Sequence, residues 1–213
     1  MNFISEELED YVAAHSQKEP QLLAQLNKET HQKILQPRML SGHFQGRVLS
    51  MLSKLISPTA ILEVGTYTGY AALCLAEGLA KNGTLDTIDI NEELADFQQK
   101  YFDLSEYKNQ ITKHTGNALD IIPTLNKTFD LVFIDADKEN YIAYFDMLVP
   151  FMKKGGIILS DNVLWSGKVL EPQKNKDTST AVLVEYNKKI NEDPRVETVL
   201  LPIRDGLTVT RVL

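Results

Sequence analysis

Residues 60–70 read Ala-Ile-Leu-Glu-Val-Gly-Thr-Tyr-Thr-Gly-Tyr, and this stretch decides the fold. A short, mostly apolar run that follows Pro58 and stops at Gly65 predicts a buried strand that turns directly into a helix. Gly65 and Gly69 permit a tight turn whose backbone can approach a ligand closely. The turn lacks the Gly-x-Gly-x-x-Gly spacing of a dinucleotide site, so it does not identify a ligand by itself.

Helix and strand patterns alternate on both sides of this turn. Five strands separated by helices predict a parallel sheet with helices on both faces, and the short 202–206 connection permits only an antiparallel final pair. With no repeat and no linker in the sequence, we expect residues 1–213 to form a single domain. The predicted strands are 60–64, 85–88, 111–114, 130–134, 157–160, 196–201 and 207–212. The predicted helices are 5–14, 20–35, 46–56, 69–80, 91–104, 139–152 and 178–191, with a short one interrupted by Pro123.

Composition excludes several classes of protein. The net charge of -7 argues against a general nucleic-acid binder, and the densest basic stretch, 168–176, is interpreted as a solvated loop. The single cysteine, Cys74, excludes a disulfide scaffold and a multi-cysteine zinc site. No apolar run is long enough to span a membrane, and residues 1–7 are acidic where a signal peptide would be basic and then apolar. We therefore expect a soluble, cytoplasmic protein.

Acidic residues stand at or near the ends of four predicted strands. These residues are Glu63, Asp89, Asp135 and Asp161, the last followed by Asn162. In an open parallel sheet these ends meet at one edge, where ligands bind. Each acid alone is explained equally well as a helix cap, but capping gives no reason to gather four like charges at one edge. A bound cation or a cationic ligand would explain why the four acids lie together.

The spacing of two of these acids indicates the ligand. Glu63, just before Gly65, would repel a pyrophosphate but would attract an ammonium or sulfonium group. Asp89 follows Gly65 by 24 residues, where a carboxylate can bind both hydroxyls of a ribose. A nucleoside that carries positive charge in place of phosphates satisfies both conditions. S-adenosylmethionine is such a molecule.

Four ordered motifs resemble one enzyme family. They are residues 63–70, residues 134–138 followed by Asn140-Tyr141, residues 160–163, and residues 201–207. Together they resemble the cation-dependent O-methyltransferases typified by caffeoyl-CoA and catechol O-methyltransferases, from about Met39 to the C-terminus. The resemblance implies a seven-stranded, Rossmann-like methyltransferase sheet, mostly parallel with its last strand antiparallel and with helices on both faces. We expect residues 1–40 to add extra N-terminal helices that cover the active site or form a dimer contact.

The resemblance also implies a cofactor site. Glu63 would hold the methionine ammonium, Asp89 the ribose, and Ala118 would lie near the adenine. Ala71 stands where relatives often have a serine, so one hydrogen bond to the cofactor carboxylate is expected to be missing. The full implied set is Met39, Ser41, Glu63, Gly65, Thr66, Tyr67, Ala71, Asp89, Ala118 and Asp135.

A metal site and a general base are implied in the same way. Asp135, Asp161 and Asn162 match the ligands of a divalent cation, and their hard oxygens suit Mg²⁺ first, with Mn²⁺ or Ca²⁺ as alternatives. Such an ion activates and orients an acceptor hydroxyl, and two adjacent hydroxyls would chelate it, which favours catechol-like or other small phenolic acceptors. Lys138 matches the catalytic base beside Asp135, because a nearby cation disfavours its positive charge.

Three further residues are candidates for contact with the substrate. His43 lies near the segment that covers the cofactor, and Trp165 could form an aromatic wall. Arg204 stands where relatives often have glycine, so the substrate preference of the family cannot be carried over. Relatives are often homodimers, and we expect the same here.

Two other functions fit the sequence. Some bacterial relatives methylate a hydroxylated wobble uridine in tRNA, although the charge of -7 weighs against an RNA substrate. The same fold also serves dehydrogenases and non-catalytic nucleotide-binding modules. The tRNA alternative uses the same chemistry on another substrate, whereas the fold alone does not exclude the other two functions. The acids at the strand ends and Lys138 make methylation of a small phenol the leading hypothesis.

Overall fold

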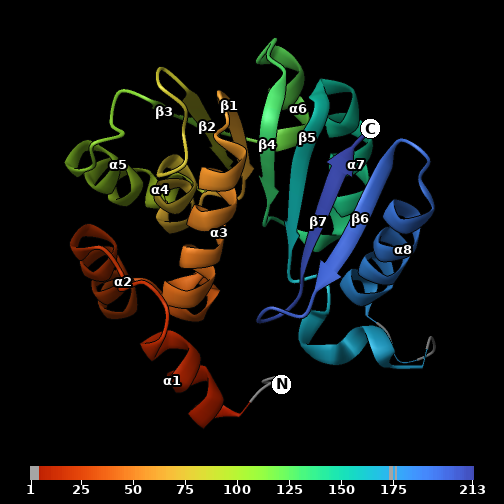
Figure 1. The fold of residues 1–213 in the computed structure, drawn as a ribbon, viewed down its shortest axis with the longest axis horizontal. Coiled ribbons are helices and arrows are strands. Elements are labelled where there is room, and N and C mark those ends of the chain that lie inside the picture. Colours follow the sequence, from red (N-terminus) through yellow and green to blue (C-terminus); the bar gives the residue numbers. More distant parts are fainter. Residues whose placement is uncertain (1–4, 173–174, 176) are drawn as a thin grey trace.

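The computed structural model describes residues 5–172, 175 and 177–213. Within these residues the chain forms a seven-stranded sheet in the order β3-β2-β1-β4-β5-β7-β6 (Figure 1). Strand β7 pairs antiparallel with both β5 and β6, and the remaining neighbours pair in parallel. The predicted Rossmann-like sheet with an antiparallel last strand is confirmed. Its strands are β1 (Ala60–Val64), β2 (Thr84–Asp89), β3 (Ile111–Thr115), β4 (Phe129–Ile134), β5 (Met152–Asp161), β6 (Val196–Leu201) and β7 (Leu207–Val212).

Helices cover both faces of the sheet because side chains alternate along each strand. In β1, Leu62 packs in the core formed with α6, α7 and α8, whereas Ile61 packs in the core formed with α2, α3, α4 and α5. The helices are α1 (Glu6–Ala14), α2 (Gln21–Lys33), α3 (Gly42–Ile56), α4 (Tyr70–Ala76), α5 (Ala95–Leu104), α6 (Ala118–Ile121), α7 (Tyr141–Leu148) and α8 (Thr178–Glu192).

Short 3-10 helices flank several of these elements. The predicted helix 91–104 consists of η2 followed by α5, and the predicted helix 139–152 consists of η4, α7 and η5. Pro150 lies within η5 and cannot donate the backbone hydrogen bond that would continue α7. These elements are η1 (Pro37–Met39), η2 (Glu92–Leu94), η3 (Ile122–Thr124), η4 (Lys138–Asn140), η5 (Val149–Phe151) and η6 (Trp165–Leu170).

The strand order fixes where a ligand can bind. The chain leaves β1 toward β2 and β3 on one side, and β4 and β5 lie on the other side of β1. In such a sheet the crevice opens at the carboxyl ends of the strands where the order reverses, here between β1 and β4. Figure 1 shows α1 and the β6–β7 connection at the same end of the molecule.

Three predicted boundaries were wrong by four or five residues. Helix α3 begins at Gly42 and not at Gly46, because its first four residues, Gly-His-Phe-Gln, include one apolar side chain only and so lack the apolar pattern. Helix α4 ends at Ala76 and not at 80, where Gly78 packs directly on the backbone of Ser53. Strand β5 begins at Met152 and contains Gly155, because it pairs with β4 across an irregular register.

Two predictions from the sequence fall partly on residues outside the ranges that the structure describes. Residues 1–4 of the predicted N-terminal cover, and Lys174 and Lys176 of the basic stretch, lie outside the described residues. Among the residues that are described, no helix is long and apolar enough to cross a membrane.

Candidate active site

A large pocket opens at the carboxyl ends of the parallel strands. Its volume is about 1970 Å³, whereas a pocket for one small ligand measures roughly 300–1,000 Å³. There is therefore room for two ligands side by side. Its wall brings together most of the predicted site residues: Met39, Ser41, His43, Gly65, Tyr67, Asp89, Ala118, Asp135, Lys138, Asp161, Asn162, Trp165 and Arg204.

The glycine turn after β1 forms the floor of this pocket. Gly65 has a φ of +103°, and a Cβ atom there would lie 2.0 Å from the carbonyl oxygen of Asp135. The amide of Asp135 donates to the carbonyl of Val64 over 2.8 Å, and the amide of Gly65 donates to Ile88 over 2.9 Å. Only glycine lets the end of β1 approach the residue after β4 this closely.

Three predicted cofactor residues lie behind the wall. Glu63, Thr66 and Ala71 are buried and do not line the pocket. The hydroxyl of Thr87 donates to Glu63 Oε2 over 2.5 Å and shares a hydrogen bond of 2.5 Å with the hydroxyl of Thr66. Glu63 Oε1 is buried without a hydrogen-bond partner among the described residues. Burial raises the pKa of Glu63 well above its ordinary value.

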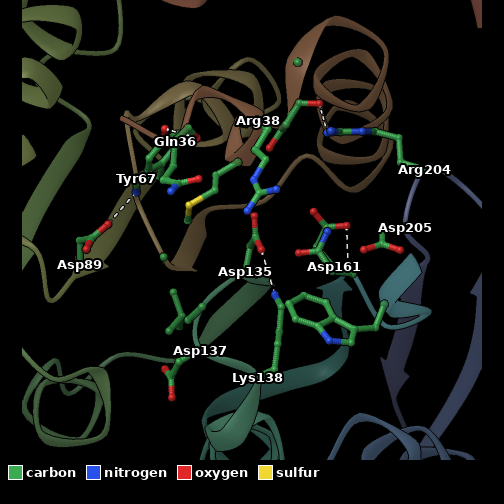
Figure 2. A pocket seen from close by; sticks show the side chains of 18 of the residues that line it. Gln36, Arg38, Tyr67, Asp89, Asp135, Asp137, Lys138, Asp161, Arg204 and Asp205 are labelled. Carbon is green, nitrogen blue, oxygen red and sulfur yellow. Dashed lines mark hydrogen bonds and ion pairs between the residues drawn. The ribbon is translucent and has the colours of Figure 1, made fainter. Parts of the chain in front are cut away.

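Asp89 is held rigidly at the end of β2. Its two carboxylate oxygens accept hydrogen bonds from the backbone amides of Tyr67, at 2.6 Å, and Asn91, at 2.8 Å. The hydroxyl of Tyr67 donates to the carbonyl of Gln36, which ties the turn after β1 to the segment before α3 (Figure 2). Each oxygen of Asp89 keeps a lone pair for a hydroxyl donor in the pocket.

Two carboxyl groups and an amide meet at the ends of β4 and β5. Asp135 follows β4, Asp161 ends β5, and Asn162 comes next with a φ of 58°, a left-handed conformation that asparagine tolerates. Burial and the neighbouring charge of Asp135 raise the pKa of Asp161 to about 7. Two acids of like charge at one wall are the arrangement that a bound cation would stabilise.

Lys138 reaches the same wall from η4. Its Nζ lies 3.2 Å from Asp135 Oδ1 and donates to the hydroxyl of Tyr141 over 2.6 Å. That hydroxyl donates in turn to the backbone carbonyl of Asp161 over 2.9 Å. Lys138 is only 8% exposed, so this is not the solvated lysine of an ordinary helix start. Its ammonium also lies 5.8 Å from the centre of the Trp165 ring.

The candidate substrate residues have different partners. His43 contacts the carbonyl of Gln17 through Nε2 at 2.7 Å, and Trp165 Nε1 is buried without a partner among the described residues. Arg204 Nη1 donates to the carbonyl of Ser41 and, over 2.6 Å, to Gln45 Oε1. One end of Arg204 is therefore bound to the protein, although the residue lines the pocket.

Sequence reasoning missed two residues of this site. Gln45 is 1% exposed and donates to Asp161 Oδ2 over 2.5 Å. It lies in the first turn of α3, which the apolar pattern did not detect, so the sequence offered no signal for it. Asp205 also lines the pocket and accepts a hydrogen bond from the amide of Ser166. Its position between Arg204 and Gly206, in the motif that carried the resemblance, was a signal that could have found it.

Comparison with known proteins places this geometry in a family. Residues 13–213 match the O-methyltransferase family. The chain belongs to this family. Among curated relatives, the caffeoyl-CoA O-methyltransferase of Petroselinum crispum is 34% identical to this O-methyltransferase over 205 residues, which cover 91% of this chain and 85% of the relative.

Solved structures agree with the family. The O-methyltransferase from Bacillus cereus, in complex with SAH, superposes with a TM-score of 0.90 at 27% identity and covers 97% of each chain. The O-methyltransferase from Streptomyces achromogenes involved in tomaymycin synthesis, in complex with SAM, gives a TM-score of 0.89 at 26% identity and covers 97% of this chain and 96% of that one. The prediction of an S-adenosylmethionine-dependent O-methyltransferase is thereby confirmed. The cation, the acceptor and the roles of single residues stay predictions.

Proposed function

We propose that this O-methyltransferase moves the methyl group of S-adenosylmethionine to a hydroxyl of a catechol-like or other small phenolic acceptor, with a divalent cation as a second cofactor. The observation that carries the proposal is the group of oxygen ligands at one wall, Asp135, Asp161 and Asn162, with Lys138 Nζ 3.2 Å from Asp135. The relatives named caffeoyl-CoA O-methyltransferases support a small-molecule acceptor.

The residues present fit the organic cofactor. Glu63 Oε1 is a buried acceptor without a partner in the described chain, which is the kind of atom that a cofactor ammonium would satisfy. Asp89 keeps lone pairs for the hydroxyls of a ribose, and Gly65 lines the same pocket. The proposed cofactor set is the one implied by the sequence: Met39, Ser41, Glu63, Gly65, Thr66, Tyr67, Ala71, Asp89, Ala118 and Asp135.

The residues present also fit a divalent cation. Carboxylate and amide oxygens are the ligands that Mg²⁺ prefers, and water or substrate oxygens usually complete its coordination. The proposed ligands are Asp135, Asp161 and Asn162, with Mn²⁺ and Ca²⁺ as alternatives to Mg²⁺. Because the charge of Asp135 disfavours ionisation of Asp161, a cation between them would stabilise the ionised form of both.

The chain's own residues then perform four tasks in the proposed reaction. The two cofactors supply an electrophilic methyl group and an activated, oriented acceptor hydroxyl when bound. Lys138 Nζ is the group that would take the acceptor proton, and Tyr141 orients it through their 2.6 Å hydrogen bond. Asp135 would bind the cation, and its Oδ1 lies 3.2 Å from Lys138 Nζ, so it also positions Lys138. Trp165 lies beside Lys138 and provides a flat wall for an aromatic acceptor, with His43 and Arg204 as further candidates for contact with it.

Three remaining features belong to the same proposal. Residues 1–213 would act as a single domain whose first 40 residues cover the site, which is supported by Ala13 of α1 and residues 33–36 in the pocket wall. We further propose a homodimer in the cytoplasm, on the sequence argument alone. Size-exclusion chromatography with light scattering tests the dimer, and a mass near 24.0 kDa would reject it.

Methyl transfer from labelled S-adenosylmethionine tests the proposal. We expect catechol to be methylated with Mg²⁺, the activity to stop on chelation with EDTA, and Asp135→Asn to lower kcat/KM for catechol by more than about 100-fold, the upper end of effects for residues that only support a metal ligand. Asp137→Asn is the matched control, because Asp137 is bound to Tyr144 and Asn140. Full activity after chelation would reject the cation, and label in tRNA but not in catechol would favour the RNA alternative.

A further inference from the structure

Three hydrogen-bonded side chains link the segment between β6 and β7 to Asp161, a proposed ligand of the cation. Arg204 Nη1 donates to Gln45 Oε1 over 2.6 Å, and Gln45 Nε2 donates to Asp161 Oδ2 over 2.5 Å. Gln45 and Asp161 are 1% and 2% exposed, so water does not compete for these hydrogen bonds. The three residues come from segments far apart in the sequence, and the fold alone brings them together.

The chemistry of the two partners fixes which way the Gln45 amide faces. Arginine is a donor only, and an ionised carboxylate is an acceptor only. The amide oxygen must therefore face Arg204 and the amide nitrogen must face Asp161. A turned amide would set its NH₂ group against the guanidinium and its oxygen against the carboxylate, which leaves buried groups without partners.

Gln45 in turn limits the rotation of the Asp161 carboxyl group. Oδ2 accepts from Gln45, and Oδ1 accepts from the backbone amide of Asn162 over 2.8 Å. With one donor on each oxygen, the plane of the carboxyl group is held, and each oxygen keeps a lone pair. Ligand carboxylates in metal sites are commonly held in this way, and loss of such support typically costs affinity for the metal.

We propose that Gln45 is a positioning residue that orients the Asp161 carboxylate toward the divalent cation, and that Arg204 orients Gln45. This inference rests on the proposed cation dependence. It assigns Arg204 a role in the metal site, in addition to the contact with the acceptor for which it is a candidate. An ionised glutamate at position 45 could not replace Gln45, because it has no donor for Asp161.

Direct titration of the full-length protein with Mn²⁺, followed by the electron paramagnetic resonance signal of free Mn²⁺, tests the inference without turnover. We expect Gln45→Leu to raise the Kd for Mn²⁺ roughly 10–100-fold. Gln98→Leu is the matched control, because Gln98 is also 1% exposed and its amide donates over 2.7 Å to the carbonyl of Tyr67, on the cofactor side of the pocket. We expect its Kd for Mn²⁺ to equal that of the unaltered chain.

A second readout separates positioning from a merely structural role. If Gln45 positions a ligand, saturating Mn²⁺ restores most of the kcat of Gln45→Leu while the KM for Mn²⁺ stays raised. Arg204→Met should raise the Kd for Mn²⁺ less than Gln45→Leu, and this variant decides the matter if Gln45→Leu does not fold.

The outcomes distinguish the inference from the function on which it rests. If the unaltered chain binds Mn²⁺ and both variants bind it equally well, the positioning role is overturned and the cation dependence stands. If the unaltered chain does not bind Mn²⁺, the proposed cation fails, and the inference fails with it.

Discussion

The contact between Gly65 and Asp135 makes a sharp prediction about stability. In Gly65→Ala the new Cβ atom would lie 2.0 Å from the carbonyl oxygen of Asp135, at a φ of +103°. Neither atom belongs to a flexible side chain, so the ends of β1 and β4 must separate. The substitution therefore combines two costs, backbone strain and overpacking.

Substitution of a second glycine separates the cost of backbone strain from the cost of overpacking. Gly155 in β5 has a φ of +81°, but a Cβ atom there would meet nothing closer than the Arg211 guanidinium at 3.7 Å. Gly155→Ala should therefore cost only the strain, about 1–3 kcal/mol. Gly65→Ala should add about 1–3 kcal/mol for overpacking. At about 2–4 °C per kcal/mol for a chain of this size, Gly65→Ala should melt about 2–12 °C below Gly155→Ala.

Thermal unfolding followed by circular dichroism measures this difference, with urea titrations at 25 °C as a check. The clash involves the residue proposed to hold the cation, so Gly65→Ala should also raise the KM for Mg²⁺, whereas Gly155→Ala should not. If the two variants melt at the same temperature, the close approach of β1 to β4 does not require glycine, and the reasoning is refuted.

Three other predictions concern single side chains. Tyr141→Phe removes the hydroxyl that accepts a 2.6 Å hydrogen bond from Lys138 Nζ. We expect kcat to fall by at least about tenfold, which is a small part of a typical general-base contribution, while the Kd for S-adenosylmethionine stays unchanged. An unchanged kcat would contradict the positioning of Lys138 by Tyr141. Burial would raise the pKa of Glu77, but its hydrogen bonds with Arg47, Lys54 and Ser50 together outweigh burial and lower the pKa to about 2 from 4.5. The stabilisation is therefore complete above about pH 4.5 and is lost as the pH falls toward 2. Urea titrations should show the stability gap between the unaltered chain and Glu77→Gln shrinking from pH 7 to pH 3. Burial raises the pKa of Glu63, so binding of a cationic cofactor that ionises Glu63 must release a proton. Calorimetry should therefore show the affinity for S-adenosylmethionine rising with pH. Glu63→Gln should bind S-adenosylmethionine about tenfold more weakly and without this pH dependence, and a pH dependence that persists in the variant would point to another group.

The fold was predictable because its signals are local. Each strand is a short apolar run between turn residues, and the 202–206 connection is too short for anything but an antiparallel pair. Boundaries failed where a tertiary contact replaced the local pattern. The first turn of α3 reads Gly-His-Phe-Gln and so shows no apolar periodicity, and α4 ends early where Gly78 meets the backbone of α3.

Part of the candidate site was likewise predictable from the sequence, and part was not. The acids at the carboxyl ends of β2, β4 and β5 were predictable, because parallel strands end at one edge of the sheet and these residues must therefore lie near one another. The environments of Glu63 and Lys138 were not predictable from the sequence. Glu63 lies buried behind the wall, and one of its oxygens has no hydrogen-bond partner within the part of the chain that the structure describes. Lys138 is bound to Tyr141. Both environments depend on side chains from other elements.

The sequence by itself determined the order of strands and helices, the acidic edge and the enzyme family, since strand periodicity, turn chemistry and motif spacing are properties of neighbouring residues. Only the tertiary structure decided that Gln45, 116 residues from Asp161 along the chain, donates to its carboxylate, and that Arg204 binds this glutamine. Such contacts arise when packing of the two hydrophobic cores brings α3 against the ends of the sheet, and no local pattern encodes which buried polar groups then become partners.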